Sequence, residues 1–236
     1  MVKAVSFDLW FTLIYEDVAD ERLYNLRRVN ALHRVLSRYA DVSVEDVAGV
    51  FEVFGSVRGF VDHRSLVNMI ALALGIHLDQ EGLDLLQGVY DESTKDFRPR
   101  VNDEIYEVLP RVRASGLKVA VISNTSFSEG GMRAILDNVG VSKYVDVVVS
   151  SSSVGFNKPH PGIYTRMLSE LGLRPEEVLH VGDSCINDVL GALNAGLKAA
   201  LYVGLRRGKD SNVCLKLGVP VLSRLSDLIE TGLIVS

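Results

Sequence analysis

The sequence predicts an α/β protein with a doubly wound, Rossmann-like parallel sheet and an all-helical segment inserted after its first strand. From residue 101 onward, short runs rich in Val, Ile and Leu alternate with helical patterns. This alternation is typical of a parallel sheet that helices cover on both faces. Residues 16–100 show helical spacing throughout. Right-handed crossovers between successive parallel strands would complete the doubly wound core.

The strands of this sheet are predicted from continuous apolar runs, which indicate burial on both faces. The first is KAVSFD near the N-terminus, and the others are expected at 117–123, 144–150, 176–183, 197–204 and 219–223. Helical patterns separate them, and a last short helix is expected within 225–232. The core domain is therefore predicted to comprise residues 1–15 and 101–236.

Residues 16–100 are predicted to form a helical cap domain. Apolar residues recur at helical spacing in four stretches, at 21–40, 43–54, 63–75 and 79–94. Ser43 and Asp79 are expected as N-caps, because their side chains can accept hydrogen bonds from the free amides of a first helical turn. The acidic excess of the chain also lies here, with 10 Lys and Arg against 15 Asp and Glu. A solvated helical surface is the simplest interpretation of that excess.

Composition narrows the classes of protein to consider. The 236 residues carry a net charge of −5, so the chain lacks the basic surface that nucleic-acid binding requires. No stretch of 18 apolar residues and no signal peptide is visible, which predicts a cytoplasmic protein without a membrane partner. Cys185 and Cys214 are too few for a disulfide framework, and Cys185 is expected to be a small packed residue. A monomer or a homodimer is expected.

Polar side chains follow several predicted strands at the point where each ends. They are Asp8 with Thr12, Ser123 with Asn124, Lys158, and Asp183 with Asp188. Taken singly, each such residue is more often a cap, a turn residue or a solvated charge. Because the carboxyl ends of parallel strands meet at one edge of a sheet, their joint placement predicts a single site.

The chemistry of this set is coherent. A carboxylate such as that of Asp8 can act as a covalent nucleophile, which divides one difficult displacement into two easier ones. Ser123 and Lys158 would bind negative oxygens around the reacting centre. Three carboxylates close together, from Asp8, Asp183 and Asp188, are unfavourable unless a cation such as Mg²⁺ lies among them.

Four segments resemble, in order, the motifs of the haloacid dehalogenase superfamily. They are FDLWFTL, VISNTS, VGFNKPHPGIY and HVGDSCIND. The resemblance spans nearly the whole core, whereas the predicted cap matches only in its position and helical character. It implies a hydrolase with an aspartate nucleophile that acts on a small, anionic molecule.

The resemblance also implies a role for each residue. Asp8 would attack the substrate, and Thr12 would orient it through hydrogen bonds. Ser123, with Asn124 beside it, would bind an anionic oxygen of the substrate, and Lys158 would hold the charge of the nucleophile and the leaving group. The implied Mg²⁺ ligands are Asp8, Asp183, Asp188 as second ligand or ligand orienter, and the main-chain carbonyl of Trp10.

Trp10 departs from the superfamily pattern. Phosphatases of the superfamily usually carry a second aspartate at this position, which protonates the leaving group, and its loss would cost roughly 10²–10⁴ in rate. Tryptophan cannot transfer a proton, although phosphate esters with good leaving groups need none. Trp10 has a second interpretation, in which it wedges the cap against the core without touching substrate.

Dehalogenases of the superfamily carry an aromatic residue at that position, because a halide leaves unprotonated. They generally work without metal and have a serine where GD stands in phosphatases, whereas this chain has GDSCIND. A Mg²⁺-dependent, phosphatase-like hydrolase of a small phosphorylated metabolite is therefore predicted. The alternatives are a metal-independent 2-haloacid dehalogenase, for which Arg38 is a candidate cap arginine, and a degenerate member that binds a phosphorylated ligand without turnover.

Overall fold

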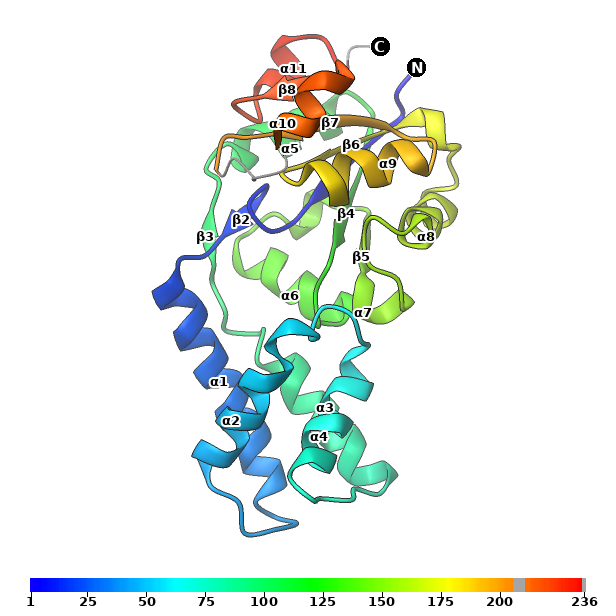
Figure 1. The fold of residues 1–236 in the computed structure, drawn as a ribbon. Coiled ribbons are helices and arrows are strands. Elements are labelled where there is room, and N and C mark those ends of the chain that lie inside the picture. Colours follow the sequence, from blue (N-terminus) through cyan, green and yellow to red (C-terminus); the bar gives the residue numbers. More distant parts are fainter. Residues whose placement is uncertain (206–210, 235–236) are drawn as a thin grey trace.

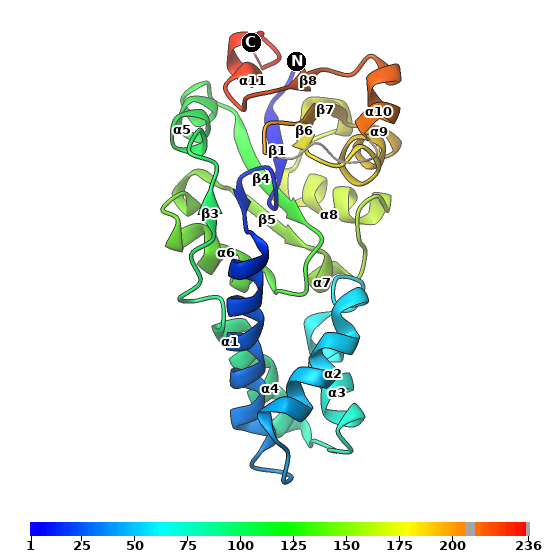
Figure 2. The ribbon, with the colours of Figure 1, turned by 60° about the vertical axis from the view of Figure 1, so that its left-hand side comes forward.

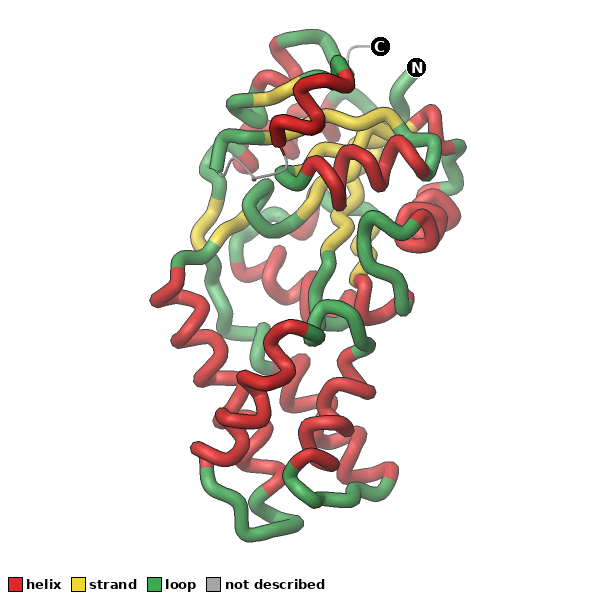
Figure 3. The backbone as a smooth tube through the Cα atoms, in the orientation of Figure 1, coloured by secondary structure: helices red, strands yellow, loops and turns green. Residues whose placement is uncertain are grey.

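A six-stranded parallel sheet forms the centre of the α/β part of the chain (Figure 1; the strands are yellow in Figure 3). The computed structural model describes residues 1–205 and 211–234. The strand order is β5-β4-β1-β6-β7-β8. The bounds are β1 (Ala4–Asp8), β4 (Lys118–Ser123), β5 (Val147–Ser150), β6 (Val178–Gly182), β7 (Lys198–Tyr202) and β8 (Val221–Leu222). The predicted doubly wound fold is confirmed.

Helices cover both faces of this sheet (Figure 2). One face packs against α5 (Ile105–Ala114) and α6 (Glu129–Asn138), and the other against α8 (Pro161–Leu171), the π-helix η4 (Cys185–Leu190) and α9 (Gly191–Asn194). Successive side chains of β1 explain the two layers, because Val5 and Phe7 belong to the first core and Ala4 to the second. All five residues of β1 are buried.

The segment between the two parts of the core is helical. Its helices are α1 (Val18–Leu36), α2 (Val44–Val53), the 3₁₀ turn η1 (Phe54–Ser56), α3 (His63–Ala73) and α4 (Gln80–Glu92). Every residue of 16–99 is described, and none of them is in a strand. Ser43 and Asp79 cap α2 and α4 through their side chains, as predicted. The helices extend from one end of the α/β part as a separate group (Figures 1 and 2).

Two short strands join this helical segment to the core. β2 (Ile14–Tyr15) pairs antiparallel with β3 (Arg100–Val101), so the outgoing and returning chains are held side by side. Arg100 strengthens the junction by donating to the carboxylates of Asp17, the N-cap of α1, and Asp20. The paired strands lie at the two boundaries predicted between core and cap.

The remaining helices are short. They are α7 (Ser151–Val154), α10 (Ser211–Cys214) and α11 (Asp227–Glu230). No helix in the part of the chain that the structure describes is long and apolar enough to cross a membrane.

Candidate active site

The sheet reverses its winding at β1, and the predicted site residues converge there. The chain adds β4 and β5 on one side of β1 and then crosses to β6, β7 and β8 on the other. Such a reversal opens a crevice at the carboxyl ends of the strands. Asp8 is the last residue of β1, Ser123 is the last of β4, and Asp183 directly follows β6.

Lys158 connects two of the predicted carboxylates. Its ammonium Nζ lies 2.5 Å from Oδ1 of Asp8 and 2.6 Å from Oδ1 of Asp188, and it also donates to the carbonyl of Ile122 at 3.2 Å. The side chain is 2% exposed. Lys158 therefore holds the carboxylate of Asp8 at the end of its strand.

Asp188 reaches the site from η4, a π-helix of the kind that often marks functional positions. Its Oδ2 accepts from the backbone amide of Ser184 at 2.9 Å. A Cβ at Gly182 would lie 2.2 Å from Cγ of Asp188. Only glycine at the end of β6 leaves room for this carboxylate.

Two hydroxyl groups of the predicted set are buried without a partner. Oγ of Ser123 and Oγ1 of Thr12 make no hydrogen bond with any residue that the structure describes, and both residues are fully buried. A buried hydroxyl without a partner is unfavourable unless a ligand supplies one. Ser123 lines the cavity at Asp8 and is available to an anionic oxygen. Thr12 makes no hydrogen bond to Asp8 in this structure, in contrast to the role that the resemblance implied.

Asn124 holds the backbone of Lys158. Its Nδ2 donates to the carbonyl of Lys158 at 2.9 Å, and its Oδ1 accepts from the amide of Lys158 at 2.7 Å. Both ends of the side-chain amide are therefore occupied. Asn124 fixes the loop that delivers Lys158, and it also lines the cavity at Asp8, so its contact with an anion stays a prediction.

Trp10 lines the cavity that contains Asp8. The cavity has a volume of about 220 Å³, and Asp183, Asn187 and Asp188 also line it. Phe11 follows with φ of 61°, so the chain turns sharply after the strand that ends at Asp8. The indole also lies 6.3 Å, centroid to centroid, from the ring of Phe97 in the returning linker. Trp10 thus touches both the cavity and the junction with the helical segment.

Burial and neighbouring charges determine the protonation of the site. Burial raises the pKa of Asp8 to about 7; Lys158 opposes the rise, and the carboxylates of Asp188 and Asp183 add to it. Burial alone would lower the pKa of Lys158, but Asp188 and Asp8 outweigh burial and raise it. Burial would raise the pKa of Asp188, yet Lys158 and His180 hold it below its ordinary value. Lys158 is therefore a permanent cation in the site.

The donor set fits a hard divalent cation. One carboxylate oxygen from each of Asp8, Asp183 and Asp188 lies within 4.8 Å of the other two. With Lys158 counted, these four side chains sum to −2 when all are ionised. Mg²⁺ prefers such oxygen ligands. The oxygens of Asp188 already accept from Lys158, Ser184 and His180, so Asp188 is well suited to orient the set.

His180 supports Asp188 from behind the site. Its two ring nitrogens lie 2.8 Å from Oγ of Ser6 and 3.3 Å from Oδ1 of Asp188, and it is fully buried. Burial lowers its pKa, although Asp188 partly opposes this. The edge of its ring contacts Tyr164 at 5.4 Å between centroids. The contact with Asp188 joins residues of β6 and η4, so no local sequence pattern indicates it.

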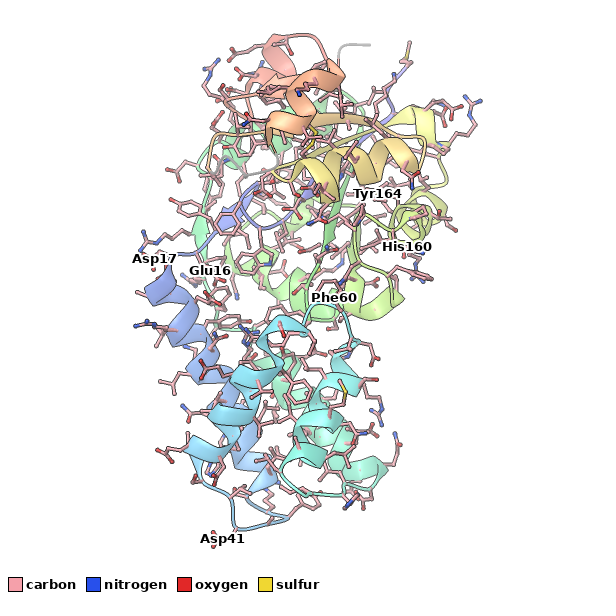
Figure 4. All side chains as sticks on the ribbon, viewed as in Figure 1. Glu16, Asp17, Asp41, Phe60, His160 and Tyr164 are labelled. Atoms are coloured by element: carbon pink, nitrogen blue, oxygen red, sulfur yellow. A yellow bond between two sulfur atoms is a disulfide. The ribbon has the colours of Figure 1, made fainter. Side chains whose placement is uncertain are left out.

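Arg38 does not belong to this site. It is exposed and lies beyond the C-terminal end of α1. Asp41, three residues further on, is labelled at the end of the helical segment that is most distant from the sheet (Figure 4). Three residues span at most about 11 Å. The expectation that Arg38 serves as the cap arginine of a dehalogenase is therefore not supported.

The two cysteines are joined, in contrast to the expectation of a packed, unpaired Cys185. A disulfide connects Cys185 in η4 with Cys214 in α10, and the two are 29 residues apart in sequence. Both residues are fully buried. The bond anchors the helix that carries Asp188 to a segment that follows β7.

Replacing Cys214 with Ala is expected to lower the free energy of unfolding by about 3–4 kcal/mol, because the unfolded chain regains the freedom that a cross-link of this span removes. The measurement is chemical unfolding of wild type and variant, each with and without a reducing agent. Reduction should destabilise only the wild type. A variant as stable as the oxidised wild type would contradict the expectation.

The chain matches the haloacid dehalogenase-like hydrolase family over residues 2–196, and it belongs to that family. A curated relative is the phosphoglycolate phosphatase of Pectobacterium atrosepticum, which is 32% identical over 130 residues. The match covers 53% of this chain and 52% of the relative, so the chain spans about half the length of that protein.

Two solved structures resemble the whole chain. A HAD phosphatase from Thermococcus onnurineus is 26% identical with a TM-score of 0.61, and 98% of this chain and 97% of that chain are covered. A 2-haloacid dehalogenase from Pseudomonas syringae has a TM-score of 0.65 at 22% identity, over the same shares of the two chains. The second likeness concerns the fold alone.

Proposed function

We propose that this protein is a Mg²⁺-dependent phosphohydrolase that transfers the phosphoryl group of a small metabolite to Asp8. The observation that carries the proposal is the cluster of Asp8, Asp183 and Asp188, whose ligand oxygens lie within 4.8 Å of one another. Lys158 pairs with two of them, Asp8 and Asp188. The cluster and Lys158 together leave a charge of −2, which one divalent cation neutralises. The phosphatases among the relatives support the same assignment.

Mg²⁺, held by Asp8, Asp183 and the main-chain carbonyl of Trp10, with Asp188 orienting the set, would neutralise the approach of one anion to another. Asp8 attacks phosphorus, and the bond from phosphorus to the leaving oxygen breaks. Water then hydrolyses the aspartyl phosphate, which releases phosphate and restores the carboxylate. Lys158 and the free hydroxyl of Ser123 bind the oxygens that carry the negative charge.

Residues 16–100 act as a cap over this site in the proposal. The β2–β3 pair supports this role, because both linkers cross there together and would move as one hinge. Figure 4 labels Glu16 and Phe60 where the helical segment meets the α/β part. Phe60 is 74% exposed. This exposure is expected of a side chain that contacts a ligand only after the cap closes. We further propose that the substrate is small and anionic. The proposed location is the cytoplasm, and the proposed oligomeric state is a monomer or a homodimer.

A 2-haloacid dehalogenase is the second candidate, and Trp10 is the observation that favours it. An aromatic side chain lines the cavity where a phosphatase of this family carries its general acid. A halide leaves without a proton, so this chemistry tolerates the indole. The complete set of three carboxylates around Lys158 favours the phosphohydrolase instead, because a metal-free reaction gains nothing from the additional negative charge.

Phosphate release from a panel of aryl and alkyl phosphates, with Mg²⁺ present, tests the proposal. Aryl phosphates are expected to be hydrolysed much faster, since their leaving groups depart unprotonated and Trp10 cannot supply a proton. Binding of these esters without any phosphate release would instead support a degenerate member that only binds its ligand.

A further inference from the structure

Three polar atoms near the start of the helical segment are buried and have no hydrogen-bond partner among the residues that the structure describes. They are Oε2 of Glu16, the hydroxyl of Tyr24 and Nε of Arg28. The guanidinium carbon of Arg28 lies 4.4 Å from the centre of the Tyr24 ring, and the charge of Arg28 lowers the pKa of Glu16 against the rise that burial causes. Buried polar groups are normally satisfied, so a cluster of unsatisfied ones points to a missing ligand.

Two guanidinium groups dominate this cluster. Arg28 is 6% exposed and Arg58 is half-buried, and both donate to Oδ1 of Asn25, at 2.6 Å and 3.3 Å. In the part of the chain that the structure describes, no carboxylate lies within 4.0 Å of either guanidinium. Burial lowers the pKa of Arg58, and the charge of Arg28 lowers it further. The two positive charges are therefore held together without a direct counter-ion.

Aromatic rings flank both guanidinium groups. The guanidinium carbon of Arg28 lies 4.4 Å from the ring centroid of Tyr24 and 5.1 Å from that of Phe127. The carbon of Arg58 lies 4.4 Å from the centroid of Phe51. These faces attract cations and keep the guanidinium planes in place. A ligand in this position would meet preorganised donors in a poorly hydrated space, where charge-assisted hydrogen bonds are strong.

A chain of polar contacts links Arg28 with the reaction centre. Its Nη1 donates to the hydroxyl of Tyr90 at 3.5 Å, and that hydroxyl lies 2.7 Å from Oγ of Ser126. Ser126 is three residues beyond Ser123, and three residues span at most about 11 Å. These contacts join Arg28 to the segment that directly follows Ser123, on the side of the site that the helical segment faces.

We propose that Arg28 and Arg58 bind a carboxylate at the end of the substrate remote from phosphorus, so that the substrate is a phosphorylated carboxylic acid. This inference rests on the proposed function. Neither guanidinium has a carboxylate within 4.0 Å among the described residues, so a substrate carboxylate would supply the direct counter-ion. The planar guanidinium forks match carboxylate geometry.

A matched pair of substrates tests the carboxylate contact. The probes are 4-carboxyphenyl phosphate and 4-carbamoylphenyl phosphate, which have similar shapes and leaving groups and differ in the charge of one substituent. The ratio of their kcat/KM values should favour the carboxylate by roughly 10- to 100-fold in the wild type. Arg28→Met and Arg58→Met should each bring the ratio close to one. Arg34→Met, an exposed arginine on the same helix, should keep the wild-type ratio.

Binding to the Asp8→Asn variant separates this inference from the proposed function. Calorimetry with that variant measures binding without turnover. It should show tighter binding of the carboxylate probe, and adding Arg58→Met to the same variant should remove this preference. If the Asp8→Asn variant, with both arginines in place, binds the two probes equally, the inference is overturned, even if the wild type hydrolyses both. An equal loss with both probes in Arg28→Met would also overturn it, because a purely structural role predicts that result. Failure to hydrolyse any phosphate ester, with the binding preference intact, would refute only the proposed function.

Discussion

Replacing Asp8 with Asn is expected to reduce turnover by about 10⁴-fold or more while the fold is retained. The amide keeps the volume of the side chain and can still accept a hydrogen bond from Lys158, but it cannot form the covalent intermediate. Lys158 also keeps its second partner, Asp188, so the charge of the ammonium stays compensated. The measurement is kcat on the best aryl phosphate, with Tm recorded for the same samples.

A surface aspartate provides the matched control for this variant. Asp137 is exposed near the end of α6, so Asp137→Asn makes the same chemical change away from the site. It should leave both kcat and Tm unchanged. Near-wild-type turnover by Asp8→Asn would mean that another group attacks the substrate.

Replacing Trp10 with Asp is expected to raise kcat/KM on alkyl phosphates by roughly 10²–10⁴-fold. An alkoxide leaves only when it is protonated, and the new carboxyl group would lie in the same cavity as Asp8. Aryl phosphates should change far less, because their leaving groups need no proton. The measurement is the ratio of the two kcat/KM values before and after the change.

Trp10→Phe distinguishes the effect of supplying a proton from the effect of removing the indole. It keeps an aromatic ring near Phe97, which Trp10 contacts across the junction, and it brings no acid. We expect it to leave the ratio of alkyl to aryl rates at the wild-type value. A rise with Phe as large as that with Asp would show that space in the cavity limits alkyl substrates, not the missing proton.

Much of the fold could be predicted because its cause is local in the sequence. Each strand of the sheet is a continuous apolar run, and Ser43 and Asp79 carry the side chains that begin helices α2 and α4. Helix α5 was not predicted. Its middle contains Pro110, a residue that usually interrupts helical patterns, yet the helix is retained against β4.

The meeting of Asp8, Ser123, Lys158 and the two later aspartates at one edge of the sheet could also be predicted, because parallel strands bring their carboxyl ends together. The detailed partners could not. No local pattern indicates that both ends of the Asn124 amide hold the backbone of Lys158, because that contact depends on tertiary packing.

Features that depend on contacts distant in sequence were missed. Arg28 resembles any arginine on an amphipathic helix, and only the packing of α1 against α4 and the loop after β4 buries it. Arg38 was chosen as the candidate cap arginine from its position in the chain alone, and the structure shows that it is exposed. The bond between Cys185 and Cys214 likewise depends on the approach of η4 and α10, which no local pattern records.

Parallel measurement of phosphate and halide release, with Mg²⁺ and again in excess chelator, tests the central assignment most directly. An aryl phosphate and 2-chloropropionate serve as the two substrates. Phosphate release that requires Mg²⁺ and stops on chelation, with no halide release in either condition, is the predicted result. Halide release that continues in the chelator would contradict the phosphohydrolase assignment and establish the dehalogenase in its place.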